Sequence, residues 1–519
     1  MKIAQTNQNE MEREPRIGHE RGHSSLAGMV MKTCCSLAAL LAVLSLGAIA
    51  GQVAGPTFLT NGDLTISYTG TPGNQYAAEW ADSLIPPVTW TPLLTNTADS
   101  NGLVSFTNTP AGSQTFYRVH DVTTMIPLVY AVENTGTNCA PPPLPIFGPF
   151  VPFLPDPFMW ADGSGRSTNF ADWKCRRAEI TAQIENYEIG PKPAVDIPSQ
   201  ITASYSGGTT AGSSGTLTVY VTVGTNTLTL TSPIIIPSGA IAPYPVCIGM
   251  DSPYGALNAS DFTSRGIAGV IYSESQVSPY GNPQNTDPYH TLYGPGLNVD
   301  NTGQYSAWAW GVSRIIDGLT LVTNTLPIDL NHICVTGCSY AGKLALFAGA
   351  FDERVALTVA QESGGGGATS WRYSHSDPSN VEDIDNTDYN WFANQMQQFS
   401  GANVSYLPED HHELMAMCAP RALFVTANPD YSWLSNPSCY VCSRAVQQIY
   451  NTLGIPDRFG FSIVGGHSHC AFPSSQDSEL GYFLDKFMLG QTNLSTIVAT
   501  YPTNYTSINY ARWYARWGN

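Results

Sequence analysis

The sequence predicts an α/β fold with a mostly parallel central sheet and helices on both of its faces, preceded by a small all-β module. Between residues 127 and 519, short apolar runs bounded by Gly and Pro alternate six or more times with segments of helical spacing. Between residues 51 and 126, segments of alternating polarity are separated by Gly, Asn and Pro turns, which is typical of a β-sandwich-like module. A Pro-rich stretch, "NCAPPPLPIFGPFVPFLPDPFMWADG", follows the module and opens the larger domain.

The elements of the larger domain alternate along the chain. The strands are expected where short apolar runs occur, at residues 242–250, 266–275, 332–337, 355–363, 421–429 and 459–466. The helices are expected where apolar residues have helical spacing, at residues 305–322, 341–351, 443–454 and 478–489. Because parallel strands need crossover connections, this alternation predicts three layers with the sheet in the middle.

Composition limits the partners of this chain. Charged residues make up 12% of its 519 residues, whereas about 25% is ordinary for soluble proteins. The 40 acidic and 22 basic residues give a net charge of −18, so a polyanion would be repelled. We therefore expect no nucleic-acid partner.

The N-terminus predicts export. From Met31, a Lys is followed by an apolar segment that ends at Ala48-Ile49-Ala50, the small-residue pattern of a signal-peptidase site. We expect residues 1–50 to be leader and signal peptide, with cleavage after Ala50. A membrane anchor is the alternative, but the apolar run is shorter than the roughly 20 residues that a spanning helix needs. The prediction is a secreted protein, extracellular or periplasmic, with no membrane partner after cleavage.

Cysteines fit the same compartment. Removal of the leader leaves nine of the eleven cysteines, and an oxidising environment favours disulfides among them. Because nine is odd, at least one thiol stays unpaired.

A candidate nucleophile lies where a predicted strand meets a predicted helix. Ser339 is in the sequence Gly337-Cys338-Ser339-Tyr340-Ala341-Gly342, which departs from G-x-S-x-G because Ala341 stands where the second Gly is usual. A Ser on such a turn is held at the carboxyl end of the sheet, beside the backbone N–H donors of a helix N-terminus. A buried turn serine is the alternative interpretation.

A candidate base follows the last predicted strand. A serine hydroxyl needs a positioned base to remove its proton, and "VGGHSHCAFP" offers His467 and His469 on a Gly-rich loop. A zinc site made by His467, His469 and Cys470 is the alternative. Its weakness is that "DHH" at residues 410–412 is the only further candidate ligand group, so we expect no metal and no organic cofactor.

Two carboxylates are candidates for the group that orients the base. Glu362 ends the predicted strand directly after the nucleophile, and Asp430 follows the next strand along the chain. The positions of these two residues in the sequence do not decide which of them is the acid.

Three separated blocks of the sequence resemble the glucuronoyl esterases, the fifteenth family of carbohydrate esterases. The blocks are "GCSYAGKLAL…FDERVALTVAQESGGGGATSWRYS", "PEDHHELMAMCAPRALF" and "GFSIVGGHSHCAFPSSQ", and "LPDPFMWADG…DWKCRRAEI" upstream is also similar. The likeness covers roughly residues 139–490. It implies the α/β-hydrolase fold for the larger domain.

The resemblance also implies catalytic roles. They are Ser339 as nucleophile, His469 as base and Glu362 as acid, with Asp430 kept as a second candidate for the acid.

Disulfides are implied as well. The family bridges would be Cys338–Cys470 and Cys139–Cys175. A third family bridge is in doubt because Ser370 stands where its first Cys is expected.

Further residues are implied to contact the substrate. They are Lys343 and Trp433, with Glu382 or Asp388 as additional polar contacts. The family usually has Arg directly after the nucleophile, where this sequence has Tyr340. The Tyr340 backbone N–H is the oxyanion donor that remains.

Function follows from the resemblance. It implies a monomeric serine esterase that hydrolyses esters of 4-O-methyl-glucuronic acid on glucuronoxylan, as in lignin–carbohydrate linkages, by a two-step acyl transfer. Another secreted carboxylesterase, such as an acetyl xylan esterase, would use the same triad. A non-catalytic carbohydrate-binding protein is the alternative from a different class, motivated by Tyr340 and the β module.

Overall fold

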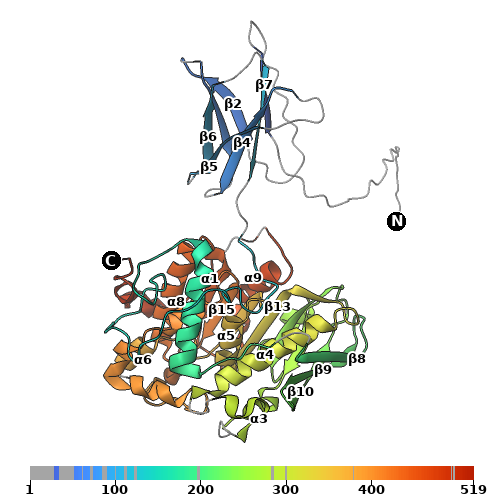
Figure 1. The fold of residues 1–519 in the computed structure, drawn as a ribbon, viewed down its shortest axis with the longest axis vertical. Coiled ribbons are helices and arrows are strands. Elements are labelled where there is room, and N and C mark those ends of the chain that lie inside the picture. The colour runs from blue at the N-terminus through green and yellow to red at the C-terminus, as the bar shows by residue number, and fades with distance from the viewer. Residues whose placement is uncertain are drawn as a thin grey trace, which may run out of the picture. The chain divides into compact units, whose positions relative to one another are not determined.

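The fold of this chain was analysed in a computed structural model (Figure 1). It describes residues 28–33, 52–60, 62–70, 74–83, 91–99, 101–109, 114–121, 126–195, 199–281, 286–297, 301–377, 379–492, 494 and 497–518. Contacts divide the chain into two compact units, Met1–Ile126 and Pro127–Asn519. Each unit is described by itself.

The first unit contains two antiparallel sheets. One has the strand order β2-β3-β6 and the other β1-β7-β4-β5. Side chains from both sheets, among them Ile66, Phe106, Tyr117 and Val119, share one buried core, as in a β-sandwich. The strands are β1 (Gly28–Thr33), β2 (Gln52–Phe58), β3 (Leu64–Thr69), β4 (Gln75–Ala81), β5 (Thr91–Thr97), β6 (Leu103–Asn108) and β7 (Gln114–Asp121).

One strand of this unit lies inside the predicted leader. β1 pairs antiparallel with β7 from Gly28 opposite Val119 to Thr33 opposite Gln114. The predicted cleavage site at Ala48–Ala50 lies outside the described residues.

The second unit is built on a sheet of ten strands in the order β17-β16-β15-β14-β13-β11-β12-β10-β9-β8. All neighbours from β17 to β12 are parallel, whereas β12, β10, β9 and β8 pair antiparallel in succession. The strands are β8 (Ile201–Gly207), β9 (Ser214–Val223), β10 (Asn226–Ile235), β11 (Tyr244–Met250), β12 (Ala268–Tyr272), β13 (Ile328–Cys338), β14 (Leu357–Gln361), β15 (Ala422–Ala427), β16 (Phe459–Ile463) and β17 (Ala499–Thr500). The predicted mostly parallel sheet is confirmed, and β8, β9 and β10 are strands for which the sequence analysis gave no expectation.

Helices cover both faces of this sheet. On one face, Phe262 of α2 and Phe483 of α9 pack with Leu357 and Phe424 of the strands. On the other face, the Gly349 Cα of α5 lies against Thr358, the neighbour of Leu357 on β14, and neighbouring strand residues point to opposite faces. The helices are α1 (Phe170–Ile184), α2 (Ala259–Thr263), α3 (Pro288–Tyr293), α4 (Gln304–Leu321), α5 (Tyr340–Phe351), α6 (Trp371–Ser376), α7 (His411–Ala416), α8 (Asn436–Thr452) and α9 (Asp477–Phe487).

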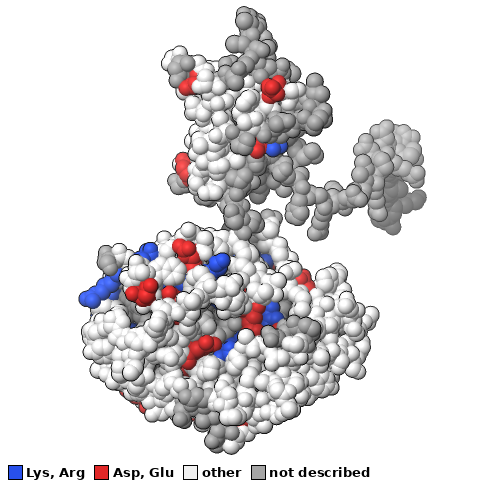
Figure 2. All heavy atoms as spheres, viewed as in Figure 1, with Lys and Arg blue, Asp and Glu red and all other residues white. Residues whose placement is uncertain are grey.

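The central strands are apolar along their whole length because both faces are covered. Every residue of β11, β14, β15 and β16 is buried. Charged residues make up 12% of the chain, and the face seen in Figure 2 is mostly neutral. Among the helices of the described residues, none is long and apolar enough to cross a membrane.

Two buried arginines hold the C-terminal end of α5, the helix that follows Ser339. Arg421 donates to the Gly349 and Asp352 carbonyls, and Arg177 of α1 donates to the Ala350 carbonyl at 2.6 Å. Cations favour this end of a helix because its last carbonyls lack intrahelical partners and carry partial negative charge. The α1 segment therefore supports the helix that begins at the candidate nucleophile.

We expect Arg177→Ala to lower the free energy of unfolding by about 3–5 kcal/mol, because it leaves a buried carboxylate without its partner. Arg177 Nη1 lies 2.9 Å from Glu353 Oε2, and both side chains are buried. Urea unfolding followed by tryptophan fluorescence measures the change. Arg166→Ala is the control, since Arg166 makes an ion pair with Asp156 nearer the surface and should change the free energy by under about 1 kcal/mol. Equal, small changes in both variants would contradict the supporting role of Arg177.

Candidate active site

Ser339 lies on a sharp turn between β13 and α5. Its backbone has φ 60° and ψ −127°, outside the conformations that L-residues usually adopt. The turn is held by the Ser339 N–H, which donates to the Gln361 carbonyl at 3.0 Å, and by the Ser339 carbonyl, which accepts from Gly342 and Lys343. This is the strand-to-helix geometry that exposes a nucleophile at the end of a sheet.

Two glycines make room for this turn. A Cβ on Gly337 would lie 2.3 Å from the Ala341 carbonyl oxygen, and a Cβ on Gly342 would lie 2.4 Å from the Gln361 carbonyl oxygen. Ala341 lies in the first turn of α5 and is buried, so its small side chain is accommodated there. The departure from G-x-S-x-G noted in the sequence thus leaves the turn intact.

His469 and Glu362 are joined by a hydrogen bond. His469 Nδ1 lies 2.7 Å from Glu362 Oε2, and the same oxygen accepts from the Cys470 N–H at 3.2 Å. Glu362 follows β14 directly and is 1% exposed, whereas the His469 side chain is 24% exposed. A carboxylate on Nδ1 fixes the tautomer of the ring and leaves Nε2 free to take a proton.

A disulfide connects the turn of the nucleophile to the loop of the base. Cys338 precedes Ser339, Cys470 follows His469, and their sulfurs are bonded, with the two Cα atoms 5.7 Å apart. One covalent bond therefore joins residues that are 132 positions apart, and one hydrogen bond joins residues that are 107 positions apart.

His467 and Asp430, the remaining candidates from the sequence, make hydrogen bonds that support the loop that carries His469. His467 Nε2 lies 2.9 Å from the Val464 carbonyl and its Nδ1 lies 3.1 Å from the Ser468 carbonyl. Exposed Asp430 accepts from the Gly466 N–H at 2.6 Å. Glu362 rather than Asp430 makes the contact with His469.

Strained backbone is concentrated around these residues. Within the described chain, positive φ at residues other than glycine is found at Asp251, Ser339, Glu362, Ser435 and Cys470. Ser339 and Glu362 are candidate catalytic residues, Cys470 follows the base, and Asp251 contacts Tyr340. Such strain persists only where the surroundings fix the backbone, and it is frequent at functional sites.

Tyr340 turns its side chain toward two carboxyl groups. Its hydroxyl lies 3.2 Å from Glu274 Oε1 and 3.4 Å from Asp251 Oδ2. Its ring packs edge-on against Tyr280 and lies near Trp391. Burial, followed by the nearby carboxyl groups of Glu274 and Asp251, raises the pKa of the Tyr340 phenol above its ordinary value, so the hydroxyl keeps its proton. The sequence gave no indication of Asp251 or Glu274, because only the fold brings them together with Tyr340.

Lys343 and Glu382 form an ion pair beside the nucleophile. Lys343 Nζ lies 2.7 Å from Glu382 Oε2 and 2.9 Å from Oε1, and it sits over the Trp391 ring, 4.6 Å from the centroid. Lys343 is one helical turn after Ser339, so its ammonium group lies on the same side of α5 as the site. The two predicted substrate contacts are therefore brought together.

Asp388 and Trp433 both follow this pair in the sequence. Trp433 is 48% exposed, its ring lies 6.0 Å from that of His469, and its carbonyl accepts from the Glu382 N–H. The Asp388 carboxylate accepts from the backbone and side chain of Asn390, in the turn that presents Trp391.

Metal ligation at the candidate zinc site, which includes His469 and Cys470, is disfavoured by the chemistry of the sulfur atoms. The ligand atoms of Cys338, His469 and Cys470 lie within 4.8 Å of one another, but both sulfurs belong to the disulfide and so are not thiolates. In the "DHH" segment, His411 Nε2 lies 2.6 Å from Glu188 and His412 Nε2 lies 2.9 Å from the Pro155 carbonyl. That segment belongs to the buried core.

The expected cysteine bridges are present. Cys338–Cys470 and Cys139–Cys175 are bonded, and both pairs agree with the resemblance. Ser370, in place of a third bridge, exchanges hydrogen bonds with Ser438, the neighbour of Cys439. Cys247, Cys334, Cys418, Cys439 and Cys442 are free and buried.

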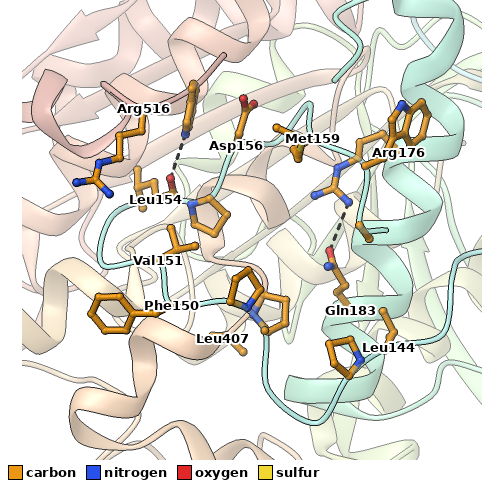
Figure 3. A pocket seen from close by; sticks show the side chains of 18 residues that line it. Leu144, Phe150, Val151, Leu154, Asp156, Met159, Arg176, Gln183, Leu407 and Arg516 are labelled. Carbon is orange, nitrogen blue, oxygen red and sulfur yellow. Dashed lines mark hydrogen bonds between the residues drawn. The ribbon is translucent and has the colours of Figure 1, made fainter. Parts of the chain in front are cut away.

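A cavity of about 300 Å³ lies elsewhere, between the Pro-rich stretch, α1 and the C-terminal residues (Figure 3). Its walls are mostly apolar. Its buried cation, Arg176, donates to Glu179, Gln183 and Glu413, and none of the three candidate catalytic residues lines the cavity. It lacks a nucleophile with a base and is distinct from the candidate site.

The chain was compared with known proteins. The family model described as "Glucuronyl esterase, fungi" matches residues 219–454. A 4-O-methyl-glucuronoyl methylesterase of Wolfiporia cocos is 40% identical over 374 residues, which are 69% of this chain and 87% of that protein. One of Podospora anserina is 36% identical over 389 residues, 73% of this chain and 77% of that protein.

Solved structures agree with these relatives. The glucuronoyl esterase catalytic domain of Hypocrea jecorina superposes with a TM-score of 0.64 at 35% identity and covers 73% of this chain and 98% of its own. A second structure is a mutant of the glucuronoyl esterase of Sporotrichum thermophile in complex with methyl 4-O-methyl-β-D-glucopyranuronate. It has a TM-score of 0.63 at 33% identity and covers 72% of this chain and 96% of its own. The second unit therefore has the α/β-hydrolase fold.

Glu362→Gln is expected to lower kcat for p-nitrophenyl acetate about 10³–10⁴-fold, because the amide stabilises the wrong tautomer of His469. Asp430→Asn is the matched control. It should retain activity within about tenfold, since its loss weakens one hydrogen bond to the loop backbone. A larger loss in the Asp430 variant than in the Glu362 variant would show that the acid has been misassigned.

Proposed function

Because this chain belongs to the glucuronoyl esterase family, we propose that it hydrolyses esters of 4-O-methyl-glucuronic acid with Ser339, His469 and Glu362. The observation that carries the proposal is the 2.7 Å contact between His469 and buried Glu362, beside the disulfide that ties His469 to Ser339. The reaction is that of a carboxylic ester hydrolase.

Acylation begins with a proton transfer. His469 Nε2 takes the proton of the Ser339 hydroxyl while its oxygen attacks the ester carbonyl carbon. The carbonyl oxygen becomes an oxyanion, which the Tyr340 N–H stabilises at the start of α5, where backbone donors lack intrahelical partners. Collapse breaks the bond to the alcohol, and His469 returns the proton to the departing oxygen.

Deacylation repeats the sequence with water. Nε2 of His469 removes a proton from water, the hydroxide attacks the Ser339 ester, and the serine oxygen recovers the proton as uronic acid is released. Glu362 stabilises the imidazolium in both steps.

Lys343, Glu382 and Trp433 are proposed to hold the sugar. An ammonium and a carboxylate supply donors and acceptors for hydroxyl groups, and an exposed indole face next to the base suits a pyranose ring. The complex of the Sporotrichum thermophile relative contains a methyl ester of this uronic acid, so we propose the same acid here. In the polymer, the acid would be a side group of glucuronoxylan and the alcohol a lignin unit.

The remaining parts of the chain are assigned from the sequence analysis. We propose that residues 1–50 direct secretion, that residues 51–126 form a separate module, that residues 127–519 form the catalytic domain and that the enzyme acts as a monomer.

Benzyl glucuronate hydrolysis tests the function. The full chain without its leader is expected to turn over this ester, and Ser339→Ala should lower kcat by at least about 10³-fold, since the nucleophile is lost. Ser275→Ala, at an exposed serine, is the control and should retain activity. A higher kcat/KM for methyl glucuronate than for p-nitrophenyl acetate would support a uronate site. The reverse order would favour a general acetyl esterase, and no turnover of any ester would overturn the proposal.

Substitution of Lys343 tests the sugar contact. Lys343→Gln is expected to raise KM for benzyl glucuronate about 10- to 100-fold, because hydrogen bonds from a charged donor contribute about 1.5–3 kcal/mol, while p-nitrophenyl acetate hydrolysis changes little. Lys174→Gln, at an exposed lysine of α1, is the control. Equal losses on both esters would indicate that Lys343 supports the turn and not the sugar.

A further inference from the structure

Asp251 and Glu274 place two carboxyl groups at the hydroxyl of Tyr340, the residue after the nucleophile. Asp251 follows β11 and Glu274 lies just after β12, so both are at the carboxyl edge of the sheet, in the two strands beyond β13. Glu274 is 4% exposed, and none of the donor groups of the described residues lies against its Oε2. Among the ion pairs of the described residues, neither carboxyl group is included.

The contacts require one shared proton. The Tyr340 hydroxyl has a single hydrogen, yet it lies 3.2 Å from Glu274 and 3.4 Å from Asp251. It can donate to only one of them. The second carboxyl is favourable there only if it is protonated, so that it can donate to the phenolic oxygen or to the other carboxyl, with which it also forms a side-chain hydrogen bond. Buried Glu274 is the better place for the proton, because burial penalises its ionised form more than that of exposed Asp251.

The groups around Glu274 favour the same assignment. The titratable side chains that face it are Asp251 after β11, Tyr272 of β12 and Tyr340 of α5. None of the three supplies a positive charge. Burial, together with the negative charge of Asp251, raises the pKa of Glu274 above its ordinary value. A carboxylate without a cation in such surroundings retains its proton to higher pH.

The anchored phenol fixes the backbone of the first turn of α5. The Tyr340 ring is packed by Tyr280 and Trp308, and the Tyr340 carbonyl accepts from the Tyr305 hydroxyl at 3.3 Å. These contacts fix the hydroxyl, the ring and the carbonyl of Tyr340. The backbone N–H of Tyr340, in the peptide bond to Ser339, therefore has one orientation.

We propose that Glu274 is a positioning residue for ester hydrolysis: its protonated carboxyl donates to Tyr340, Tyr340 donates to Asp251, and the chain holds the Tyr340 N–H toward the oxyanion. The proposal rests on the esterase function proposed above and deepens it. Loss of the Glu274 proton leaves two carboxylates facing one hydroxyl hydrogen. It also adds a negative charge near the developing oxyanion, so the rate falls as pH rises through the pKa of Glu274.

The pH dependence of kcat and kcat/KM for benzyl glucuronate tests this proposal. The acidic limb of such a profile reports the general base, which must be neutral to act. The alkaline limb of the wild type is assigned to Glu274. In Glu274→Gln the side chain stays neutral and its amide still donates to Tyr340, so the alkaline limb should move up by more than about one pH unit, the scale of an ordinary carboxyl perturbation, while the acidic limb stays in place.

Glu185→Gln is the matched control. Burial raises the pKa of Glu185 to about 7 as well, but the groups around it are Lys192 and Glu133, not Tyr340. This variant should keep the wild-type alkaline limb. Tyr340→Arg is the second variant, because a guanidinium pairs with both carboxylates and should also remove the alkaline fall, even if Glu274→Gln does not fold.

The outcomes are distinguishable. The role of Glu274 is overturned if the folded Glu274→Gln variant has the same alkaline limb as the wild type. If that variant does not fold, the same result in Tyr340→Arg overturns the role. So does a shift that Glu185→Gln reproduces. A wild type that is inactive at every pH overturns the esterase function itself.

Discussion

The hydrogen bond between His469 Nδ1 and Glu362 Oε2 is the interaction on which the site depends. A buried carboxylate is costly unless it is paired, and here the ring and the Cys470 N–H both donate to one oxygen of Glu362. The bond sets the tautomer of His469, while the Cys338–Cys470 bridge keeps its loop beside Ser339. Since an error of about 1 Å in catalytic geometry can cost about 10²-fold in rate, a covalent link next to both groups is well placed.

The candidate catalytic residues lie at one edge of the sheet, and the helix that follows Ser339 is supported at both of its ends. Ser339 and Glu362 both follow parallel strands directly, and the carboxyl ends of parallel strands meet at one edge. Arg177 and Arg421 hold the far end of α5. The helix that begins at the nucleophile is therefore fixed at its first turn by tight backbone packing and at its last turn by buried cations.

Much of this architecture was predictable from residue type alone. Buried parallel strands are apolar throughout, so segments such as 459–466 were apparent in the sequence. β8 to β10 were missed, although β9 alternates buried and exposed residues, because Thr and Ser take many of its positions. Position could not separate Glu362 from Asp430, since both follow strands that end at the same edge. The disulfides came from family resemblance, because pairing depends on distances that spacing does not encode.

Charge at the site is consistent with the direction of the reaction. In the proposed reaction, hydrolysis turns a neutral ester into a carboxylate at the carbon that Ser339 would attack. Glu382 is paired with Lys343 and Glu362 with His469, whereas Asp251 has no cation beside it among the described residues, and the whole chain carries −18. A negative field costs the neutral substrate little but repels the acid product. The same field opposes the oxyanion of the transition state, so a further negative charge beside it would slow the reaction. A proton retained on Glu274, as proposed, keeps that further charge away from the oxyanion, while the net charge of the chain still repels the product.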